Sequence, residues 1–199
     1  MLKKKLKPSF GKKSIILIAV AVALIAADLL TKYFEERFVW NAVIIPGFAE
    51  IESGHRNPGC AFSFLADNPS VGQPILIALT IVLLAVLIFG FIFIPERFTV
   101  LKTAVSIVIA GAIGNLVDRI FIPFAVRDWF GLWMFGNMTY CNFADFWIVI
   151  GVALAIVDLL FFNEWAVFPL TKKAKEAQAA RKAEEEFNKN KEDNGENQQ

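Results

Sequence analysis

The sequence contains few of the residues that build metal centres and cofactor sites in soluble enzymes. Its 199 residues include one histidine, His55, and two cysteines, Cys60 and Cys141. These three residues are too few and too scattered for a Cys/His zinc site. The chain also lacks a glycine-rich loop of the kind that holds phosphates. We therefore predict that the protein uses neither a metal ion nor another cofactor.

An excess of charge of one sign is also absent. Lys and Arg together number 20 and Asp and Glu 19, so the formal net charge is +1. This balance indicates neither nucleic acid nor an acidic partner, and nothing in the sequence indicates an obligate protein partner. The charges gather in a lysine-rich start (1–13) and a polar tail (166–199). The tail could begin as a solvated helix, and we expect its end to be disordered.

What the sequence has in excess is apolar residues. They make up 56% of the chain, compared with roughly 45–50% in a typical soluble domain. A membrane core of about 30 Å needs about 20 helical residues. Four segments within a membrane domain of residues 14–165 meet this length: 14–34, 75–94, 102–122 and 143–162. The sequence therefore predicts an all-α protein that crosses the membrane four times.

The distribution of Lys and Arg predicts the orientation. The basic N-terminus, the short link with Arg97 and the lysines at 172–175 fall on one side of a four-span chain. By the positive-inside rule, both termini are cytoplasmic and the longer loops, 35–74 and 123–142, face outward. An alternative interpretation is that the first apolar run is a cleaved secretory signal. We favour a retained span, because the apolar character continues beyond Asp28.

Charged side chains within the spans need a reason, since each costs about 2.5–3.5 kcal/mol at the bilayer centre. Lys102 and Asp158 lie near span ends, where we expect them to reach water. Asp28 and Lys32 are four residues apart in the first span, which suits an ion pair that faces the other helices.

The third span carries polar residues along one side. Gly111 permits close approach of a neighbouring helix, and Asn115, Asp118 and Arg119 follow at helical spacing. Asp118 and Arg119 could satisfy each other, or they could belong to a functional site. The sequence alone leaves both interpretations open.

Two more carboxylates lie next to the outer ends of the spans. Asp128 is in the second outer loop, and Asp145 begins the fourth span three residues after Asn142. Asn142 and Asp145 could simply form a capping box. Aromatic residues crowd the same loop, which places it at the membrane surface; they are Phe121, Phe124, Trp129, Phe130, Trp133, Phe135 and Tyr140.

If Asp128 and Asp145 meet, they cannot both ionise easily. The positive end of the fourth helix favours Asp145 as the ionised member. Such a pair can activate one water molecule, with one carboxyl as base and the other as proton donor. The first outer loop differs from the second: residues 38–51 predict short strands around Pro46-Gly47, and Asn57-Pro58-Gly59 predicts a turn.

Several separated segments together match one known pattern. They are Asp28-Leu-Leu-Thr-Lys32, Ile45-Pro-Gly-Phe48, Asn57-Pro-Gly-Cys-Ala-Phe62, Gly111-Ala-Ile-Gly-Asn-Leu-Val-Asp-Arg119, Val126-Arg-Asp-Trp129 and Phe143-Ala-Asp145. In order and spacing, from about residue 14 to 165, they resemble the bacterial lipoprotein signal peptidase family, also called signal peptidase II.

The resemblance implies four transmembrane helices, a small β-like outer cradle and a membrane-surface helix or loop. It also implies an aspartic endopeptidase of the bacterial inner membrane that cuts prolipoproteins at the outer face, just before a diacylglyceryl-modified cysteine. By position it assigns the catalytic pair to Asp128 and Asp145, with Asp128 rather than Asp118 as the acid that activates the nucleophile.

The resemblance extends to supporting residues. It implies that one group lines or orients the site, namely Asn57, Gly59, Asn115, Arg119 and Asn142. A second group is structural: Asp28, Lys32, Gly111 and Asp118, the last paired with Arg119. A Cys60–Cys141 disulfide is conceivable because both residues are predicted outside the membrane.

Two functions of other classes compete with this interpretation. In a small proton-coupled transporter, Asp28, Asp118, Asp145 and Asp158 would form a relay across the membrane. We disfavour it, because all but Asp158 gather toward the outer side. A non-catalytic assembly subunit would tolerate the loss of both Asp128 and Asp145.

Overall fold

The computed structural model describes residues 7–59, 66–134 and 136–196. Within these ranges, four helices are long and apolar enough to cross a membrane. They are α1 (Lys12–Arg37), α2 (Pro69–Phe93), α3 (Thr99–Phe121) and α4 (Phe143–Val157), which continues as a π-helical turn, η2 (Asp158–Phe162). The predicted four-span frame is therefore confirmed. The first three helices begin a few residues before the predicted spans, at Lys12, Pro69 and Thr99.

The chain divides into two compact units, Met1–Val152 and Ala153–Gln199. In the first unit α3 lies between α1 and α2 and contacts both. Small residues also bring α3 against the first part of α4. A Cβ added to Gly111 would collide with the Ala144 backbone oxygen, and one added to Gly151 would lie 2.6 Å from Val108. Among the four candidate spans, the one with the lowest mean hydropathy, α3, is thus the most enclosed.

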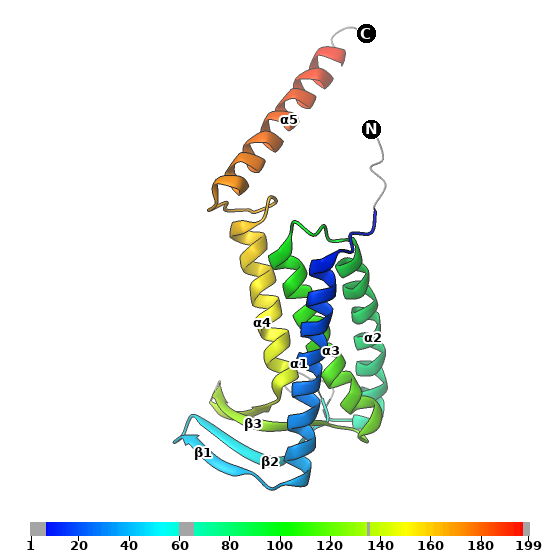
Figure 1. The fold of residues 1–199 in the computed structure, drawn as a ribbon, viewed down its shortest axis with the longest axis vertical. Coiled ribbons are helices and arrows are strands. Elements are labelled where there is room, and N and C mark those ends of the chain that lie inside the picture. The colour runs from blue at the N-terminus through cyan, green and yellow to red at the C-terminus, as the bar shows by residue number, and fades with distance from the viewer. Residues whose placement is uncertain (1–6, 60–65, 135, 197–199) are drawn as a thin grey trace. The chain divides into compact units, whose positions relative to one another are not determined.

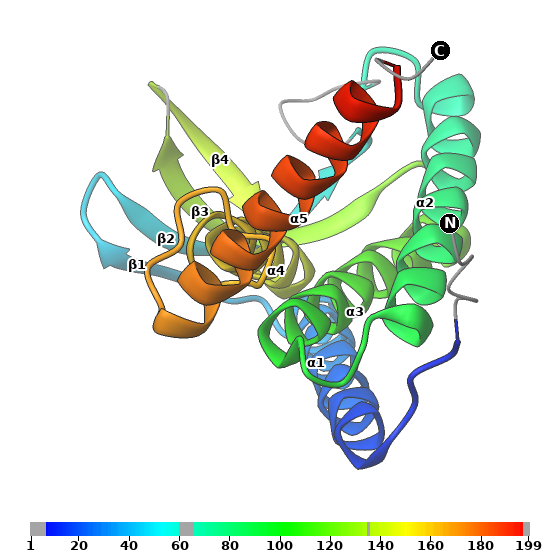
Figure 2. The same ribbon diagram turned by 90° about the horizontal axis from the view of Figure 1, so that it is seen from above.

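A four-stranded antiparallel sheet lies beside the helix ends where α1 stops and α4 starts (Figures 1 and 2). Its order is β1 (Asn41–Ile45), β2 (Ala49–Asn57), β3 (Val126–Met134) and β4 (Asn137–Cys141). The strands predicted around Pro46-Gly47 are β1 and β2, and Gly47 has the positive φ of 71° that its turn needs.

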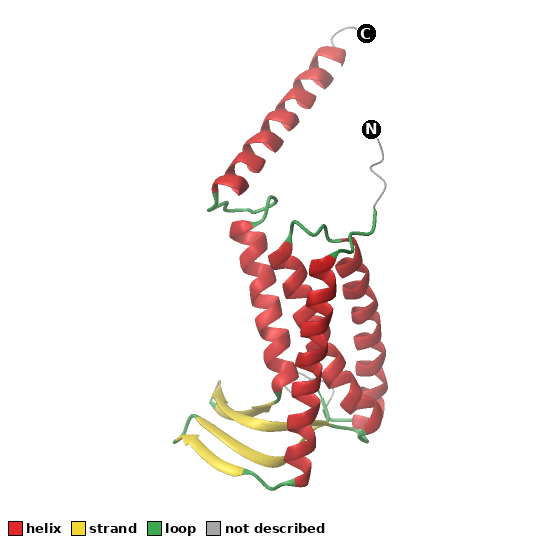
Figure 3. Ribbon diagram, in the orientation of Figure 1, coloured by secondary structure: helices red, strands yellow, loops and turns green. Residues whose placement is uncertain are grey.

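The expectation of an all-α fold with a surface helix or loop in the second outer segment is wrong. That segment forms β3 and β4 (Figure 3). β3 is hydrogen-bonded on both sides, by β2 and by β4. One of these two partners, β2, lies about 70–80 positions earlier in the chain, and local sequence pattern cannot reveal that pairing.

Not all aromatic residues of this segment face the membrane surface. Trp129 is only 6% exposed, and its ring packs edge-to-face on Phe143 at 5.1 Å. Phe130 packs similarly on Phe146 at 5.6 Å. These rings fix β3 against the first turns of α4. Trp133 is exposed, whereas Phe135 lies outside the described residues.

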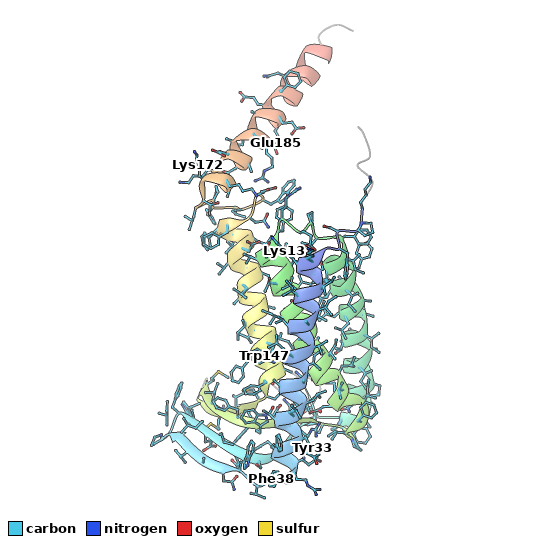
Figure 4. The ribbon with its side chains drawn as sticks, viewed as in Figure 1. Lys13, Tyr33, Phe38, Trp147, Lys172 and Glu185 are labelled. Atoms are coloured by element: carbon cyan, nitrogen blue, oxygen red, sulfur yellow. The ribbon has the colours of Figure 1, made fainter. Side chains whose placement is uncertain are left out.

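The opposite end of the three helices holds a buried charge cluster. Lys13 lies there, while Tyr33 and Phe38 lie beside the sheet (Figure 4). Lys102 was expected to reach water, but the structure buries it: the residue is 1% exposed. Its ammonium group donates to the Ser9 carbonyl at 2.5 Å and to Glu96 at 3.2 Å. The N-terminal segment covers Lys102, which removes its route to solvent.

The second unit contains the rest of α4 and η2 together with α5 (Lys172–Glu196). Asp158 is 5% exposed and accepts a hydrogen bond from the Asn163 side chain at 2.9 Å, so the expectation that it meets water is wrong. The helix extends beyond the first half of the tail. Disorder at its end stays a prediction, as do the limits of the three segments into which the sequence divides the chain.

Candidate active site

Asp128 lies in the middle of the sheet, on β3, and is 2% exposed. Its backbone pairs with His55 of β2. The Asn142 side chain donates a hydrogen bond to its Oδ1 at 2.7 Å, and the Asn57 side chain donates another. A carboxyl group is therefore enclosed where the sheet meets the helices, held by two amide donors.

Asp145 is the third residue of α4 and is half-buried. Its backbone N–H donates to Asn142 Oδ1 at 3.1 Å, and the Asn142 N–H donates to Asp145 Oδ2 at 3.0 Å. This reciprocal pair is a capping box at the start of the helix. The other carboxylate oxygen, Oδ1, accepts from the Asn115 side chain of α3 at 2.8 Å. Capping and a place in the site are thus compatible roles.

Asn142 connects the two carboxyl groups. It is completely buried between β4 and α4. Its side-chain amide binds Asp128, while its backbone N–H and side-chain oxygen bind Asp145. The same amide nitrogen lies 3.1 Å from Asn115 Oδ1. One residue therefore joins a carboxyl group on a strand and a carboxyl group on a helix in the same hydrogen-bonded cluster.

The environment gives Asp128 an unusual affinity for a proton. Burial, and then the negative charge of Asp145, raise the pKa of Asp128 from 3.8 to about 7. Hydrogen bonds from Asn57 and Asn142 and the positive charge of Lys32 lower this pKa, but they do not outweigh burial. Asp128 is thus half-protonated near neutral pH.

Asp28 and Lys32 of α1 support the site by contacting the residues of α3 and α4 next to it. Lys32 Nζ lies 2.8 Å from Asp28 Oδ2 and donates to Asn115 Oδ1 at 3.1 Å. Asp28 Oδ1 accepts the backbone N–H of Ala144 at 2.8 Å, in the first turn of α4. Both side chains are fully buried. The pair therefore ties α1 to α3 and gives the helix that carries Asp145 a second capping carboxylate.

The expected Asp118–Arg119 pair does not form. Asp118 lies 2.7 Å from Arg127 Nη2 and accepts the Arg127 backbone N–H at 2.9 Å, and Lys32 is 3.5 Å away. Arg119 instead donates to the Gly59 carbonyl at 3.1 Å. Successive residues of a helix point about 100° apart and cannot face each other.

Arg127 was not singled out as a site residue from the sequence. It alternates with Asp128 along β3 and so points to the other face, where it also binds Glu36 at 3.0 Å. Its position directly before Asp128 could have drawn attention to it in the sequence, but identifying Asp118 as its partner needs the tertiary structure. Arg127 forms an ion pair with the buried Asp118 carboxylate, and this contact holds β3, the strand that carries Asp128, against α3.

The described residues contain no cluster of three His, Cys, Asp or Glu that could hold a metal ion. Cys141 lies near the carboxyl pair, and its thiol is 3.3 Å from the Phe130 carbonyl. Burial, followed by the charges of Asp145 and Asp128, raises the pKa of this thiol to about 12. It therefore stays protonated and is a poor nucleophile. Cys141 is a free thiol in the structure, and Cys60 lies outside the described residues.

Known proteins resemble this chain in sequence and in fold. Residues 20–161 match the family model described as signal peptidase (SPase) II. A lipoprotein signal peptidase of Ectopseudomonas mendocina is 31% identical over 167 residues, which are 80% of this chain and 92% of that protein. One of Staphylococcus aureus is 33% identical over 147 residues, 72% of this chain and 86% of the relative.

Solved structures agree with the sequence comparisons. Two bacterial membrane enzymes are 31% identical to this chain and superpose with TM-scores of 0.63 and 0.61. The matches cover 77% and 78% of this chain and 91% and 97% of theirs.

Proposed function

This chain belongs to the signal peptidase II family, and from that premise we propose that Asp128 and Asp145 are the pair that carries out its hydrolysis. The protein is a multi-pass membrane protease that processes prolipoproteins, as its family does. The proposal concerns which residues act, how they divide the work and how the substrate is presented. Its central support is Asn142, which holds both carboxyl groups at once.

The two carboxyl groups carry different charges at rest. Asp145 accepts hydrogen bonds on both of its oxygens, from the Asn115 side chain and the Asn142 backbone, so donors orient both oxygens. Asp128 is the member that keeps a proton up to about pH 7, because its pKa is raised to about that value. Asp145 is therefore the base that takes a proton from water. This differs from the expectation that Asp128 activates the nucleophile.

The reaction needs only these groups and one water molecule. Water attacks the carbonyl carbon of the scissile peptide bond while its proton passes to the Asp145 carboxylate. Asp128 donates its proton to the carbonyl oxygen as negative charge develops there. When the tetrahedral species collapses, the C–N bond breaks and the leaving nitrogen receives the proton held by Asp145. The hydroxyl of that species then returns a proton to Asp128.

Other polar groups orient this pair. Asn115 and Asn142 direct the carboxylate oxygens, and Asn57 donates to Asp128. Arg119 holds the turn after β2 through the Gly59 carbonyl, next to the site. Structural roles fall to Asp28, Lys32, Gly111 and Asp118, which hold α1, α3, α4 and β3 together.

The location of the pair supports cleavage at the membrane boundary. The carboxyl groups lie between apolar helices and a sheet at the helix ends, so a lipid chain on the substrate could remain among the helices while the peptide bond reaches the pair. We assign the cut to the bond before a diacylglyceryl-modified cysteine. Lys13 and Arg97 lie at the opposite end of the first three helices, so the positive-inside rule puts the site outside and both termini in the cytoplasm. No described feature favours a transporter.

Purified protein in detergent tests the assignment with a diacylglyceryl-modified prolipopeptide. Wild type should cleave it, while Asp128→Asn and Asp145→Asn should each lose at least about 10²–10⁴-fold in rate. Asp67→Asn is the matched control, since Asp67 is exposed on the outer loop and should keep full activity. An unmodified peptide should be cut far more slowly.

Each result decides something. A folded Asp145→Asn enzyme with near-normal activity would reduce Asp145 to a helix cap. The same result for Asp128→Asn would make Asp118 the next candidate. Equal cleavage of the unmodified peptide would remove the lipid requirement.

A further inference from the structure

Glu35 has no place in the catalytic pair, yet it is among the most buried charged residues. It lies in the last turn of α1, and its side chain is 1% exposed. Its Oε1 accepts the backbone N–H of Gly54 at 2.5 Å and lies 3.4 Å from Arg56 Nη1. Its Oε2 is buried without a hydrogen-bond partner among the described residues. Burying a partly unsatisfied carboxylate is costly, so the contact with Gly54 needs a reason.

Gly54 is where β2 changes its register on β3. Before it, Ile51 faces Phe130; after it, His55 faces Asp128. Four steps along β2 therefore match two steps along β3, so β2 carries two extra residues at this point. Gly54 has a φ of 95°, a left-handed conformation that favours glycine. The buried Glu35 carboxylate thus accepts a hydrogen bond from the backbone of a two-residue bulge.

The bulge decides which residue of β2 reaches Asp128. If the register of Ile51 and Phe130 simply continued, Ser53 would face Asp128, since each step forward on β2 is one step back on β3. Asn57 would face position 124 instead of Val126. At about 3.3 Å per residue, its amide would move roughly 6.6 Å along the strand, out of hydrogen-bonding range of Asp128.

Hydrophobic pattern cannot prevent such a slip. A one-residue slip turns every side chain to the opposite face and is penalised by exposure of the buried face. A two-residue slip keeps every side chain on its own face. A specific contact must therefore select the register, and the bond from Gly54 to Glu35 is placed to do so because α1 is itself held by the buried Asp28–Lys32 pair.

We propose that Glu35 is a positioning residue that fixes the register of β2 on β3 and thereby holds Asn57 against Asp128. The inference rests on the proposed role of Asp128 and adds a residue that acts on it only through the strand. Because the Asn57 hydrogen bond stabilises the Asp128 anion, losing it makes Asp128 keep its proton to higher pH. The charges that act on Asp128 are Asp145 of α4 and Lys32 of α1, with the Cys141 thiol of β4 nearby, and a change at Glu35 alters none of these groups. The remaining titratable neighbour is His55 of β2, whose backbone pairs with Asp128 and whose ring stacks on Tyr140 of β4.

The test is the pH dependence of cleavage by purified full-length variants. With Asp128 as proton donor, activity falls on the alkaline side as Asp128 ionises. In Glu35→Ala we expect that limb to move up by about one pH unit, the equivalent of one hydrogen bond to a charged group. We expect kcat to fall about 10–100-fold with KM little changed, as for a misplaced catalytic group.

Two further variants separate positioning from simple damage. Glu35→Gln keeps an oxygen that can accept the Gly54 N–H, so its pH limb should match wild type. Gly54→Ala meets open space within 4 Å but opposes the positive φ. It should move the limb like Glu35→Ala, and it carries the test if Glu35→Ala does not fold. In a folded double variant, Gly54→Ala should shift the limb little beyond Glu35→Ala alone, because both changes disrupt the same hydrogen bond between Gly54 and Glu35.

Glu52→Gln is the matched control. Glu52 is on the same strand and exposed, and it bonds Tyr140 and His55 rather than the bulge backbone. Its pH profile should equal that of wild type. If wild type cleaves and Gly54→Ala and folded Glu35→Ala give the wild-type profile, the positioning role is overturned while the catalytic pair stands. If wild type does not cleave, the proposed function fails, and the inference falls with it.

Discussion

Replacing Asp128 with asparagine should abolish activity and at the same time stabilise the protein at neutral pH. Asp128 is 2% exposed, and its pKa in the folded protein is about 7 rather than 3.8. A shift of about 3 units corresponds to about 4 kcal/mol that the folded state spends on holding an ionised Asp128. The neutral asparagine avoids this cost, and its side-chain oxygen can still accept the Asn142 hydrogen bond.

The sign of the effect sets its pH window. A raised pKa in the folded state means that folding takes up a proton, so wild-type stability falls as pH rises from about 4 to about 7. Below about pH 4, Asp128 is protonated in both states and the variant should gain almost nothing. Above about pH 7 the gain should be full, with about 4 kcal/mol as its upper bound.

Thermal unfolding in detergent, followed by the fluorescence of the five tryptophans, measures this difference. For a chain of this length, 1 kcal/mol is about 2–4 °C, so the midpoint of Asp128→Asn should exceed that of wild type by up to roughly 8–16 °C at pH 8. At pH 4 the two midpoints should nearly coincide. Asp118→Asn serves as the contrast: it leaves Lys32 and Arg127 without their shared anion and should destabilise by about 3–5 kcal/mol. A pH-independent difference for Asp128→Asn, or a lower midpoint at pH 8, would refute the reasoning.

Two other changes probe the helices that hold the site. Gly111→Ala places a methyl group against the Ala144 backbone oxygen. It should lower the free energy of unfolding by about 1–3 kcal/mol and reduce cleavage, because it displaces the start of α4. Gly90→Ala is the control: a Cβ there has nothing within 4 Å, so unfolding and cleavage should be unchanged or slightly improved. Glu96→Ala removes the acceptor of Lys102 and of the N-terminal segment; the melting midpoint should fall while cleavage at 25 °C stays normal, and a loss of activity in folded protein would contradict the separation of this cluster from the site.

Local sequence signals were sufficient for the helices and for contacts within one turn. Apolar runs as long as the membrane is thick predicted all four helices, because the bilayer leaves few alternatives. The Asp28–Lys32 pair and the Asn142–Asp145 capping box join residues three or four positions apart. Their geometry is set by the helix itself, so spacing alone predicted them.

Contacts between distant segments were beyond that reasoning. Asp118 pairs with Arg127 and not with its neighbour Arg119, because helix geometry separates adjacent side chains and β3 brings Arg127 close. Lys102 is covered by the N-terminal segment, and Trp129 by α4. Spacing within a span could not show either partner.

The sequence by itself determined a four-span membrane protein and, through its motifs, the residues to suspect. The tertiary structure decided that residues 126–134 and 137–141 are strands, that Asn142 joins Asp128 to Asp145, and that Glu35 binds the bulge in β2. It also decided the charge of Asp128, since a pKa depends on burial and on charges contributed by other elements. Helices and caps form from neighbours along the chain, whereas strand register, burial and carboxyl pairing exist only once distant segments have packed.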